Sequence, residues 1–348
     1  MELKIFRDTL PQAGTSCTVK AELPLETEIL ISDYLPPVFK LVKCFAKPVV
    51  LQKQLQPGRL TLEGYLRCTV FYQGEDGAEG IPIEAITPQN EPLNRGNSAS
   101  LFMGWEEQLS FVRDALGPKL KETGLKTKIY AFDHNYNYDN MLEQQVYPMK
   151  IYEDENAASF LTGAAYHNYG GDREELNNVN GKFPDKELIF TETSIGMWND
   201  GRNLEKRLME DMEETALGTV NNWCKAVIVW NLMLDNERGP NREGGCQTCY
   251  GAVDIDRSDY KTITRNSHYY IIGHLSSVVK PGAVRIGSKG YTADGIMYSA
   301  FENLDGTEAL VLLNNTDEAK NITVNSGERS FTYEVPAKAV ASFRWNLY

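Results

Sequence analysis

Residues 81–92, with the sequence IPIEAITPQNEP, form a short apolar run that closes on an Asn-Glu-Pro tripeptide with Glu91 at its centre. A second run, KELIFTETS over residues 186–194, carries Glu192 in a similar setting. Short runs rich in Ile, Phe and Thr, with few charges, are typical of strands buried in a parallel sheet. Each run therefore predicts a buried strand that ends on a glutamate.

The two glutamates suit one kind of chemistry. Retaining glycoside hydrolysis uses two carboxylates, one as acid/base and one as nucleophile, and barrel enzymes carry such groups at the C-terminal ends of parallel strands. A single glutamate at a strand end is more often solvated or paired with a cation. Two of them at the spacing of barrel strands are compatible with a catalytic pair, Glu91 and Glu192.

Residues 78–236 alternate between apolar strands and helical patterns, which predicts a parallel sheet with crossover helices. From Glu91 to Glu192 there are three such units of about 34 residues each, close to the ~31 residues per unit of an eightfold barrel. The five predicted strands are Ile81–Thr87, Lys128–Phe132, Leu161–Tyr166, Glu187–Thr191 and Ala226–Trp230.

Two helices are predicted from apolar residues at helical spacing. The first begins near Trp105, and Gly117-Pro118 should bend or stop it. The second begins at about Leu204. The apolar stripes consist of Leu109, Val112 and Leu116 in the first helix and of Leu204, Leu208 and Met212 in the second.

The two ends of the chain are predicted to be β-structure. Partial alternation of Thr, Val, Tyr and Phe favours strands at both ends, and the stretch Gln73–Gly77 is rich in turn residues. The predicted domains are an all-β module at 1–77, a partial barrel at 78–265 and a β-sandwich at 266–348. Candidate strands are Cys17–Leu23, Glu28–Ile31, Pro48–Gln54, Arg59–Leu66 and Arg67–Tyr72 in the first domain, and Ala309–Asn314 and Ala339–Trp345 in the last.

The composition narrows the range of partners. A net charge of −13 over 348 residues argues against nucleic acid and anionic membranes, since both need clustered Lys and Arg. It is compatible with a neutral carbohydrate substrate, on which some of the 18 Tyr and 5 Trp could stack, although most should pack the core. The sequence contains no run of 18 apolar residues, so no membrane span is predicted. Residues 1–8 lack the apolar core of a signal peptide.

The six cysteines are too sparse for a disulfide scaffold. Cys246 and Cys249 form a lone CxxC motif with no second pair at zinc-site spacing, so we expect no metal and no cofactor. A local disulfide and two free thiols both fit this motif.

Several ordered motifs resemble glycoside hydrolase family 30, the glucosylceramidase-like family of retaining β-glycosidases. The resemblance covers roughly residues 78–348, and it implies strands 4–8 of a (β/α)8 barrel followed by a β-sandwich. In place of Glu192-Thr193-Ser194 the family often has Glu-Cys-Ser. The matching segments are Ile86–Pro92, Phe132–Asn135, Ala165–Tyr169, Thr191–Ser194, Val229–Leu232, Gly239-Pro240 through Gly244–Cys246, and Tyr270–Ser276.

The resemblance implies a role for each candidate site residue. Glu91 would be the acid/base on barrel strand 4, and Glu192 the nucleophile on strand 7. Asn90 would hydrogen-bond the 2-hydroxyl of the sugar. The substrate would be a β-glucoside or related β-glycoside, either a carbohydrate or a glycolipid, and the family suggests an extracellular location.

The remaining expected site residues surround the carboxylates. His167 and Tyr169 would orient the nucleophile or line the sugar site, Trp230 would be a stacking platform, and Asp133 would support the site through hydrogen bonds. Without the resemblance, His167 and Trp230 fit core roles equally well, as a buried hydrogen-bonding histidine and a packing indole.

The N-terminal region departs from the family pattern. A family member should have three strand–helix units before the Asn-Glu-Pro strand, but here about 80 residues precede it and all are β-patterned. They resemble instead the SPOCS domain of spore-coat-associated proteins at Leu35–Val38, Ala46–Val49 and Leu62–Tyr65. A natural fusion, a truncated gene or a join in the sequence assembly would each produce this arrangement.

Two consequences follow from a partial barrel. Its edge strands would be open, so we expect contact with the N-terminal module or self-association. The leading functional hypothesis is a retaining β-glycosidase whose activity truncation of the barrel could impair. The alternative is a catalytically silent binding or structural protein associated with a spore coat.

Overall fold

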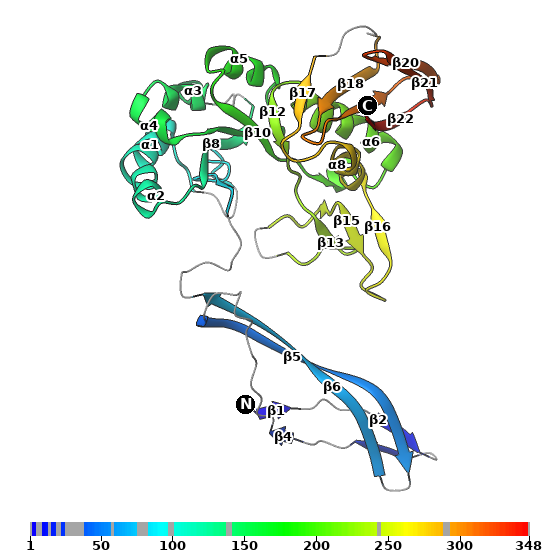
Figure 1. The fold of residues 1–348 in the computed structure, drawn as a ribbon. Helices are drawn as coiled ribbons and strands as arrows, with labels where there is room; N and C mark the ends of the chain where they lie inside the picture. Colours follow the sequence, from blue (N-terminus) through cyan, green and yellow to red (C-terminus); the bar gives the residue numbers. More distant parts are fainter. Residues whose placement is uncertain are drawn as a thin grey trace. The chain divides into compact units, whose positions relative to one another are not determined.

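The computed structural model describes residues 2–4, 9–12, 15–18, 22–24, 38–56, 59–74, 83–96, 101–136, 141–241, 245–287 and 293–346. They belong to two compact units, Met1–Ile83 and Glu84–Tyr348, which we describe separately (Figure 1). The three-domain division expected from the sequence stays a prediction.

The first unit contains only β-strands among its described residues. Its main element is an antiparallel hairpin of β5 (Val38–Gln56) and β6 (Arg59–Gly74). The two strands expected at Arg59–Leu66 and Arg67–Tyr72 are thus one continuous strand, because each residue run pairs with β5 without a break between them. The short pairs are β1 (Glu2–Lys4) with β4 (Glu22–Pro24), and β2 (Thr9–Gln12) with β3 (Thr15–Thr18).

Neither of the other two strands predicted near the N-terminus is confirmed. The expected strand Cys17–Leu23 falls partly in β3 and partly in β4, so it is not a single strand. The expected strand Glu28–Ile31 lies outside the described residues.

The second unit is built on a five-stranded parallel sheet of order β12-β10-β9-β8-β7. This sheet confirms the predicted partial barrel. Parallel pairing places the C-terminal ends of all five strands at one edge. The strands are β7 (Ala85–Ile86), β8 (Lys128–Asn135), β9 (Gly163–His167), β10 (Glu187–Glu192) and β12 (Cys224–Val227).

The first and last strands are shorter than predicted. β7 has two residues, and β12 ends three residues before Trp230. Ile228 and Trp230 still donate backbone hydrogen bonds to Phe190 and Thr193, but both side chains are about half exposed at the end of the sheet. Hydrophobicity alone does not distinguish such a half-exposed strand end from a buried strand.

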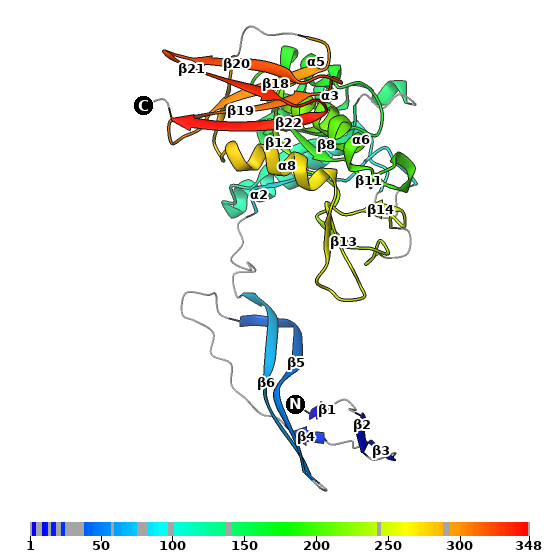
Figure 2. The same cartoon turned by 90° about the vertical axis from the view of Figure 1, so that its right-hand side faces the viewer.

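Helices cover the outer face of the sheet (Figures 1 and 2). Buried residues of the strands, such as Ile129, Tyr166 and Phe190, pack there with helical residues in the main core. The inner face carries a smaller cluster of Tyr130, Ala165 and Ile189. The helices on the barrel are α1 (Trp105–Phe111), α2 (Gly117–Thr123), α3 (Tyr147–Tyr152), α4 (Glu155–Phe160), α5 (Glu174–Lys182), α6 (Leu204–Asp211) and α7 (Leu217–Val220).

The helix that begins at Trp105 does not stop at Gly117-Pro118. A π-helical turn, Val112–Leu116, leads into α2, and the proline occupies the first turn of that helix. Proline is tolerated there because its missing N–H needs no partner within the helix. Gly117 is required for packing, since a Cβ at this position would lie 2.2 Å from the Phe160 ring.

The C-terminal part forms the predicted β-sandwich. An antiparallel sheet of order β17-β18-β19-β22 faces the hairpin β20–β21 on one side, and α8 (Ser267–Val278) packs on its other side (Figure 2). The strands are β17 (Val284–Ile286), β18 (Ile296–Glu302), β19 (Thr307–Asn314), β20 (Lys320–Ser326), β21 (Arg329–Val335) and β22 (Ala339–Asn346).

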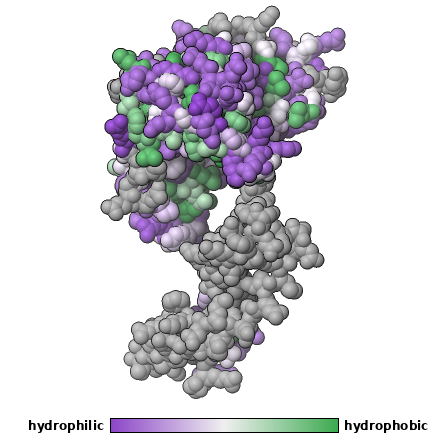
Figure 3. All heavy atoms as spheres, turned by 90° about the vertical axis from the view of Figure 1, so that its left-hand side faces the viewer, coloured by the Kyte–Doolittle hydropathy of each residue, from purple (hydrophilic) through white to green (hydrophobic). Residues whose placement is uncertain are grey.

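Small strands connect barrel and sandwich. β13 (Met233–Asp235), β15 (Val253–Ile255) and β16 (Ile263–Arg265) form one sheet, and β11 (Ile195–Gly196) pairs with β14 (Cys249–Tyr250). In the described part of the chain, no helix is long and apolar enough to cross a membrane. The face of this unit seen in Figure 3 is mainly hydrophilic, with hydrophobic residues scattered over it, as the acidic composition suggests.

The sheet depends on one glycine. A Cβ on Gly163 in β9 would lie 1.8 Å from the backbone oxygen of Glu187 in β10. Gly163→Ala should therefore lower the free energy of unfolding by about 1–3 kcal/mol or more, as overpacking does. Urea denaturation measures this effect.

Gly181 in α5 is the matched control, because a Cβ there meets no atom within 4 Å. Gly181→Ala should leave stability unchanged or raise it by up to about 1 kcal/mol. Equal stability of the two alanine variants would show that the packing of β9 against β10 is looser than described.

Candidate active site

Glu91 and Glu192 lie close together at the C-terminal edge of the parallel sheet. Three atoms lie within 4.8 Å of one another: one carboxylate oxygen of Glu91, one carboxylate oxygen of Glu192 and one ring nitrogen of His167. The carboxyl groups of retaining glycosidases are about 5–5.5 Å apart and those of inverting enzymes about 6.5–9.5 Å. The separation of the pair is therefore closer to the range of retaining enzymes than to that of inverting enzymes.

Glu91 is fixed by contacts on both its backbone and its side chain. It follows β7 in a left-handed backbone conformation, with φ 45°. Its N–H donates to the backbone oxygen of Asp133 at 2.9 Å, and its carboxylate accepts from Nδ2 of Asn94 at 2.7 Å. Asn94 was not predicted as a site residue, although its position three residues after Glu91 in a turn could have suggested a side chain that returns to the carboxylate.

Asp133 reaches the site through a β-bulge. Phe132 and Asp133 have φ values of 74° and 66°, and the pairing of β8 with β9 shifts register at this point. Such a bulge re-aims a side chain. The Asp133 carboxylate accepts hydrogen bonds from Oγ1 of Thr87 at 2.7 Å and of Thr191 at 2.6 Å, two residues that sequence reasoning missed.

His167, the last residue of β9, lies between two carboxylates. Its Nε2 is 3.1 Å from Oδ1 of Asp133 and its Nδ1 is 3.4 Å from Oε1 of Glu91. Burial alone would lower the pKa of His167, but the hydrogen bonds with Asp133 and Glu91 outweigh it and raise the pKa to about 9. The ring is therefore an imidazolium at neutral pH that donates on both sides.

The charge of Asp133 balances that of His167. Burial would raise the pKa of Asp133, but the hydrogen bonds from His167, Thr191 and Thr87 lower it below its usual value. The ionised carboxylate and the imidazolium thus stabilise each other in a buried setting.

Glu192, the last residue of β10, accepts a hydrogen bond from the Tyr169 hydroxyl at 3.0 Å. The Oγ of Ser194 is 2.5 Å from the same phenol oxygen. Because the phenol has only one proton and gives it to Glu192, Ser194 donates to Tyr169. Burial raises the pKa of Glu192, while the His167 cation and Tyr169 act in the opposite direction.

A pocket of about 260 Å³ opens beside these groups. Asn90, Asp133, His167 and Glu192 contribute to its wall. Trp230 lies beside the strands that line the pocket. Its backbone N–H donates to the backbone oxygen of Thr193 at 2.8 Å, and its side chain is 45% exposed. The pocket is also lined by Ala85, Ile86, Thr87, Tyr130, Ile189, Thr191 and Ile228.

The seven residues expected at the site thus come from the ends of neighbouring strands. Their chemical roles stay predictions.

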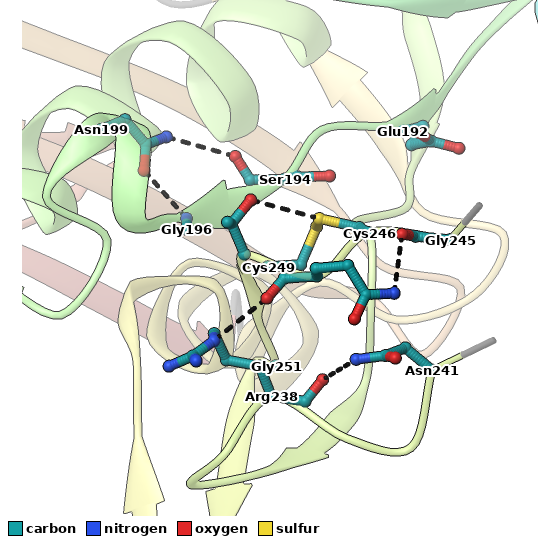
Figure 4. The surroundings of a disulfide bond; sticks show 12 residues. Glu192, Ser194, Gly196, Asn199, Arg238, Asn241, Gly245, Cys246, Cys249 and Gly251 are labelled. Atoms are coloured by element: carbon teal, nitrogen blue, oxygen red, sulfur yellow. Dashed lines mark hydrogen bonds between the residues drawn. A yellow bond between two sulfur atoms is a disulfide. The ribbon is translucent and has the colours of Figure 1, made fainter. Parts of the chain in front are cut away.

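The CxxC motif is a disulfide between Cys246 and Cys249. It lies beside β11, the short strand that follows Glu192 and Ser194 (Figure 4). Among the described residues, Cys224 at the start of β12 is a buried free thiol.

Comparison with known proteins identifies the family. The glycosyl hydrolase family 30 TIM-barrel domain matches residues 50–279, and the family 30 beta sandwich domain matches residues 282–343. The chain belongs to glycoside hydrolase family 30. The barrel match begins within the N-terminal region, and the comparisons give no support to the spore-coat resemblance of residues 1–75.

Curated relatives match most of the chain. An endo-1,6-beta-D-glucanase of Trichoderma harzianum is 31% identical over 279 residues, which are 76% of this chain and 52% of that protein. The lysosomal acid glucosylceramidase of Mus musculus is 23% identical over 315 residues, 83% of this chain and 57% of that protein. The chain therefore spans about half the length of the curated relatives it matches.

Solved structures resemble the chain as well. An endo-beta1,6-glucanase is 72% identical, with a TM-score of 0.77, over 78% of this chain and 60% of the other. SrfJ from Salmonella typhimurium is 27% identical, with a TM-score of 0.69, over 78% of this chain and 59% of the other.

The four histidines should separate in an NMR titration. Burial lowers the pKa of His134 to about 4, of His268 to about 3, and that of His274 below its usual value, whereas His167 should titrate near pH 9. The signal at high pH should vanish in His167→Gln and move to lower pH in Asp133→Asn.

The raised pKa of His167 also makes the free energy of unfolding depend on pH. The pKa of His167 is raised in the folded state, so the charged ring contributes stability that is fully present below about pH 6.5 and is lost as the pH rises through about 9. Four histidines that all titrate below pH 7 would contradict the proposed charge of His167.

Proposed function

We propose that this chain is a retaining glycoside hydrolase that acts on β-glucosides or related β-glycosides, with Glu91 as acid/base and Glu192 as nucleophile. The observation that carries the proposal is the pair of carboxylates at the C-terminal edge of the sheet, the buried Glu91 and the half-buried Glu192, with an oxygen of each within 4.8 Å of the other. Membership of family 30 supports it.

Membership of family 30 is the basis for giving the two carboxylates different roles. Glu192 would attack the anomeric carbon while Glu91 gives its proton to the leaving oxygen, which produces a glycosyl-enzyme and the free aglycone. The His167 cation, 3.4 Å from Glu91, would stabilise the carboxylate that Glu91 becomes. A water, deprotonated by Glu91, would then release the sugar with its original configuration.

Tyr169 would serve the nucleophile. Its hydroxyl holds Oε1 of Glu192, which leaves the other oxygen to face the sugar. Asn90 lines the pocket beside Glu91 and could bind a sugar hydroxyl. Trp230 offers a half-exposed ring for stacking.

β-1,6-Glucan is the first substrate to test. Endo-1,6-beta-D-glucanases recur among the curated relatives, and the solved endo-beta1,6-glucanase shares 72% of its aligned residues with this chain. Glucosylceramidase relatives make a glucosylated lipid the second candidate. No contact described here favours the silent spore-coat protein, and a turnover assay separates it from an enzyme.

Glu192→Gln should abolish turnover of an aryl β-glucoside and leave the protein folded. Glu91→Ala should lower kcat by roughly 100- to 10,000-fold, the contribution of a general acid or base, and azide should partly restore cleavage of an activated substrate. Glu302→Gln, on an exposed position of β18, is the matched control and should retain wild-type activity.

Two results would contradict the proposed roles. If both site variants lose folded structure, as judged by circular dichroism and unfolding midpoint, the two glutamates are structural. A folded wild type without activity on β-linked glucosides, glucans and glucosylated lipids would overturn the proposal.

A further inference from the structure

The Cys246–Cys249 disulfide closes a short loop whose last residue begins β14. In the antiparallel pair β11–β14, Gly196 faces Cys249 and Ile195 faces Tyr250. The Met197 N–H also donates to the Thr248 oxygen at 3.0 Å. The last two residues of the disulfide loop, Thr248 and Cys249, therefore pair with the segment that follows the nucleophile strand.

The approach of these two segments is unusually close. A Cβ on Gly196 would lie 2.6 Å from the Thr248 oxygen and 2.0 Å from the Trp198 ring. Only glycine leaves room for both neighbours. The position of β11 is thus fixed by the loop that the disulfide closes.

Ser194 links β11 to Glu192. It directly precedes β11, and its backbone oxygen accepts from Nδ2 of Asn199, whose Oδ1 accepts from the Gly196 N–H (Figure 4). Its hydroxyl lies 2.5 Å from the Tyr169 hydroxyl, which in turn donates to Glu192. A shift of β11 would therefore move Ser194 and change the orientation of Tyr169.

We propose that the Cys246–Cys249 disulfide is a positioning element of the active site, which holds Ser194, and through it Tyr169, so that Tyr169 keeps its hydrogen bond to Glu192. The inference rests on the proposed function, because it assigns the disulfide a part in the action of the nucleophile. The cross-link limits the conformations open to residues 246–249 and so stabilises β14 against β11.

Reduction should weaken this arrangement. A dithiol reductant would supply two electrons and two protons to the two sulfurs, break the S–S bond and leave as its own cyclic disulfide. Cys246 is only half-buried, so its sulfur is open to attack, whereas Cys249 is buried. Hydrolysis should then depend on the redox state of this loop.

The test uses the full chain with Cys246→Ser and Cys249→Ser combined. We expect kcat to fall about tenfold, the effect of losing one well-placed hydrogen bond to a charged group, and KM to change by less than about twofold. A dithiol should cause the same loss in the wild type, reoxidation should reverse it, and the double variant should not respond. Cys224→Ser, which removes the buried free thiol and keeps the disulfide, should behave as the wild type does.

A double-mutant cycle with Ser194→Ala tests whether the disulfide acts on Tyr169 through Ser194. If the disulfide acts through Ser194, its removal from the Ser194→Ala variant should cost less than about twofold in kcat. Additive losses in the two variants would overturn the route through Ser194, and an unchanged kcat without the disulfide would overturn the inference.

Hydrogen exchange gives a readout that does not depend on turnover. Amides of residues 192–199 should exchange faster after reduction of the folded wild type, while those of β18 and β19 should not change. If the wild type hydrolyses no glucoside, the proposed function fails, and this exchange experiment alone decides the inference. Unchanged exchange at residues 192–199 would overturn it.

Discussion

The site depends on the in-register parallel pairing of β7, β8, β9 and β10. Ala85 lies opposite Lys128, Tyr130 opposite Gly163, and Gly163 opposite Glu187, so the strands run side by side in one direction and end at one edge. Each strand then contributes one polar group to the same buried place: Thr87, Asp133, His167 and Thr191. The close backbone approach at Gly163 keeps β9 in the middle of this arrangement.

A buried network of charges follows from that pairing. Asp133 and His167 form an ion pair that two threonine hydroxyls complete, and the second ring nitrogen faces Glu91. Buried ions are costly unless their hydrogen bonds are satisfied, and here each charged atom has a partner. The network holds a cation next to Glu91, while the Tyr169 hydroxyl donates to Glu192, so the two glutamates have different surroundings.

The sequence predicted the elements that depend on periodicity and the groups that end strands. Five parallel strands and the sandwich could be named, because apolar runs leave a clear pattern. The seven site residues were named mainly from the family resemblance, and their roles stay predictions. The bulge at Phe132 and Asp133 left no such pattern, since backbone register is set by neighbouring strands. Thr87, Thr191, Asn94 and Ser194 were missed for a related reason: their roles arise only when separate strands meet.

The central claim is that Glu192 is the nucleophile of a retaining pair. Incubation with an activated 2-deoxy-2-fluoro-β-glucoside, followed by proteolysis and mass spectrometry, tests it most directly, because the fluorine slows release of the glycosyl-enzyme. We expect one added fluoroglucosyl group, attached to Glu192 in the peptide that contains this residue. A label on Glu91, or on another residue in a protein that still turns over substrate, would contradict it.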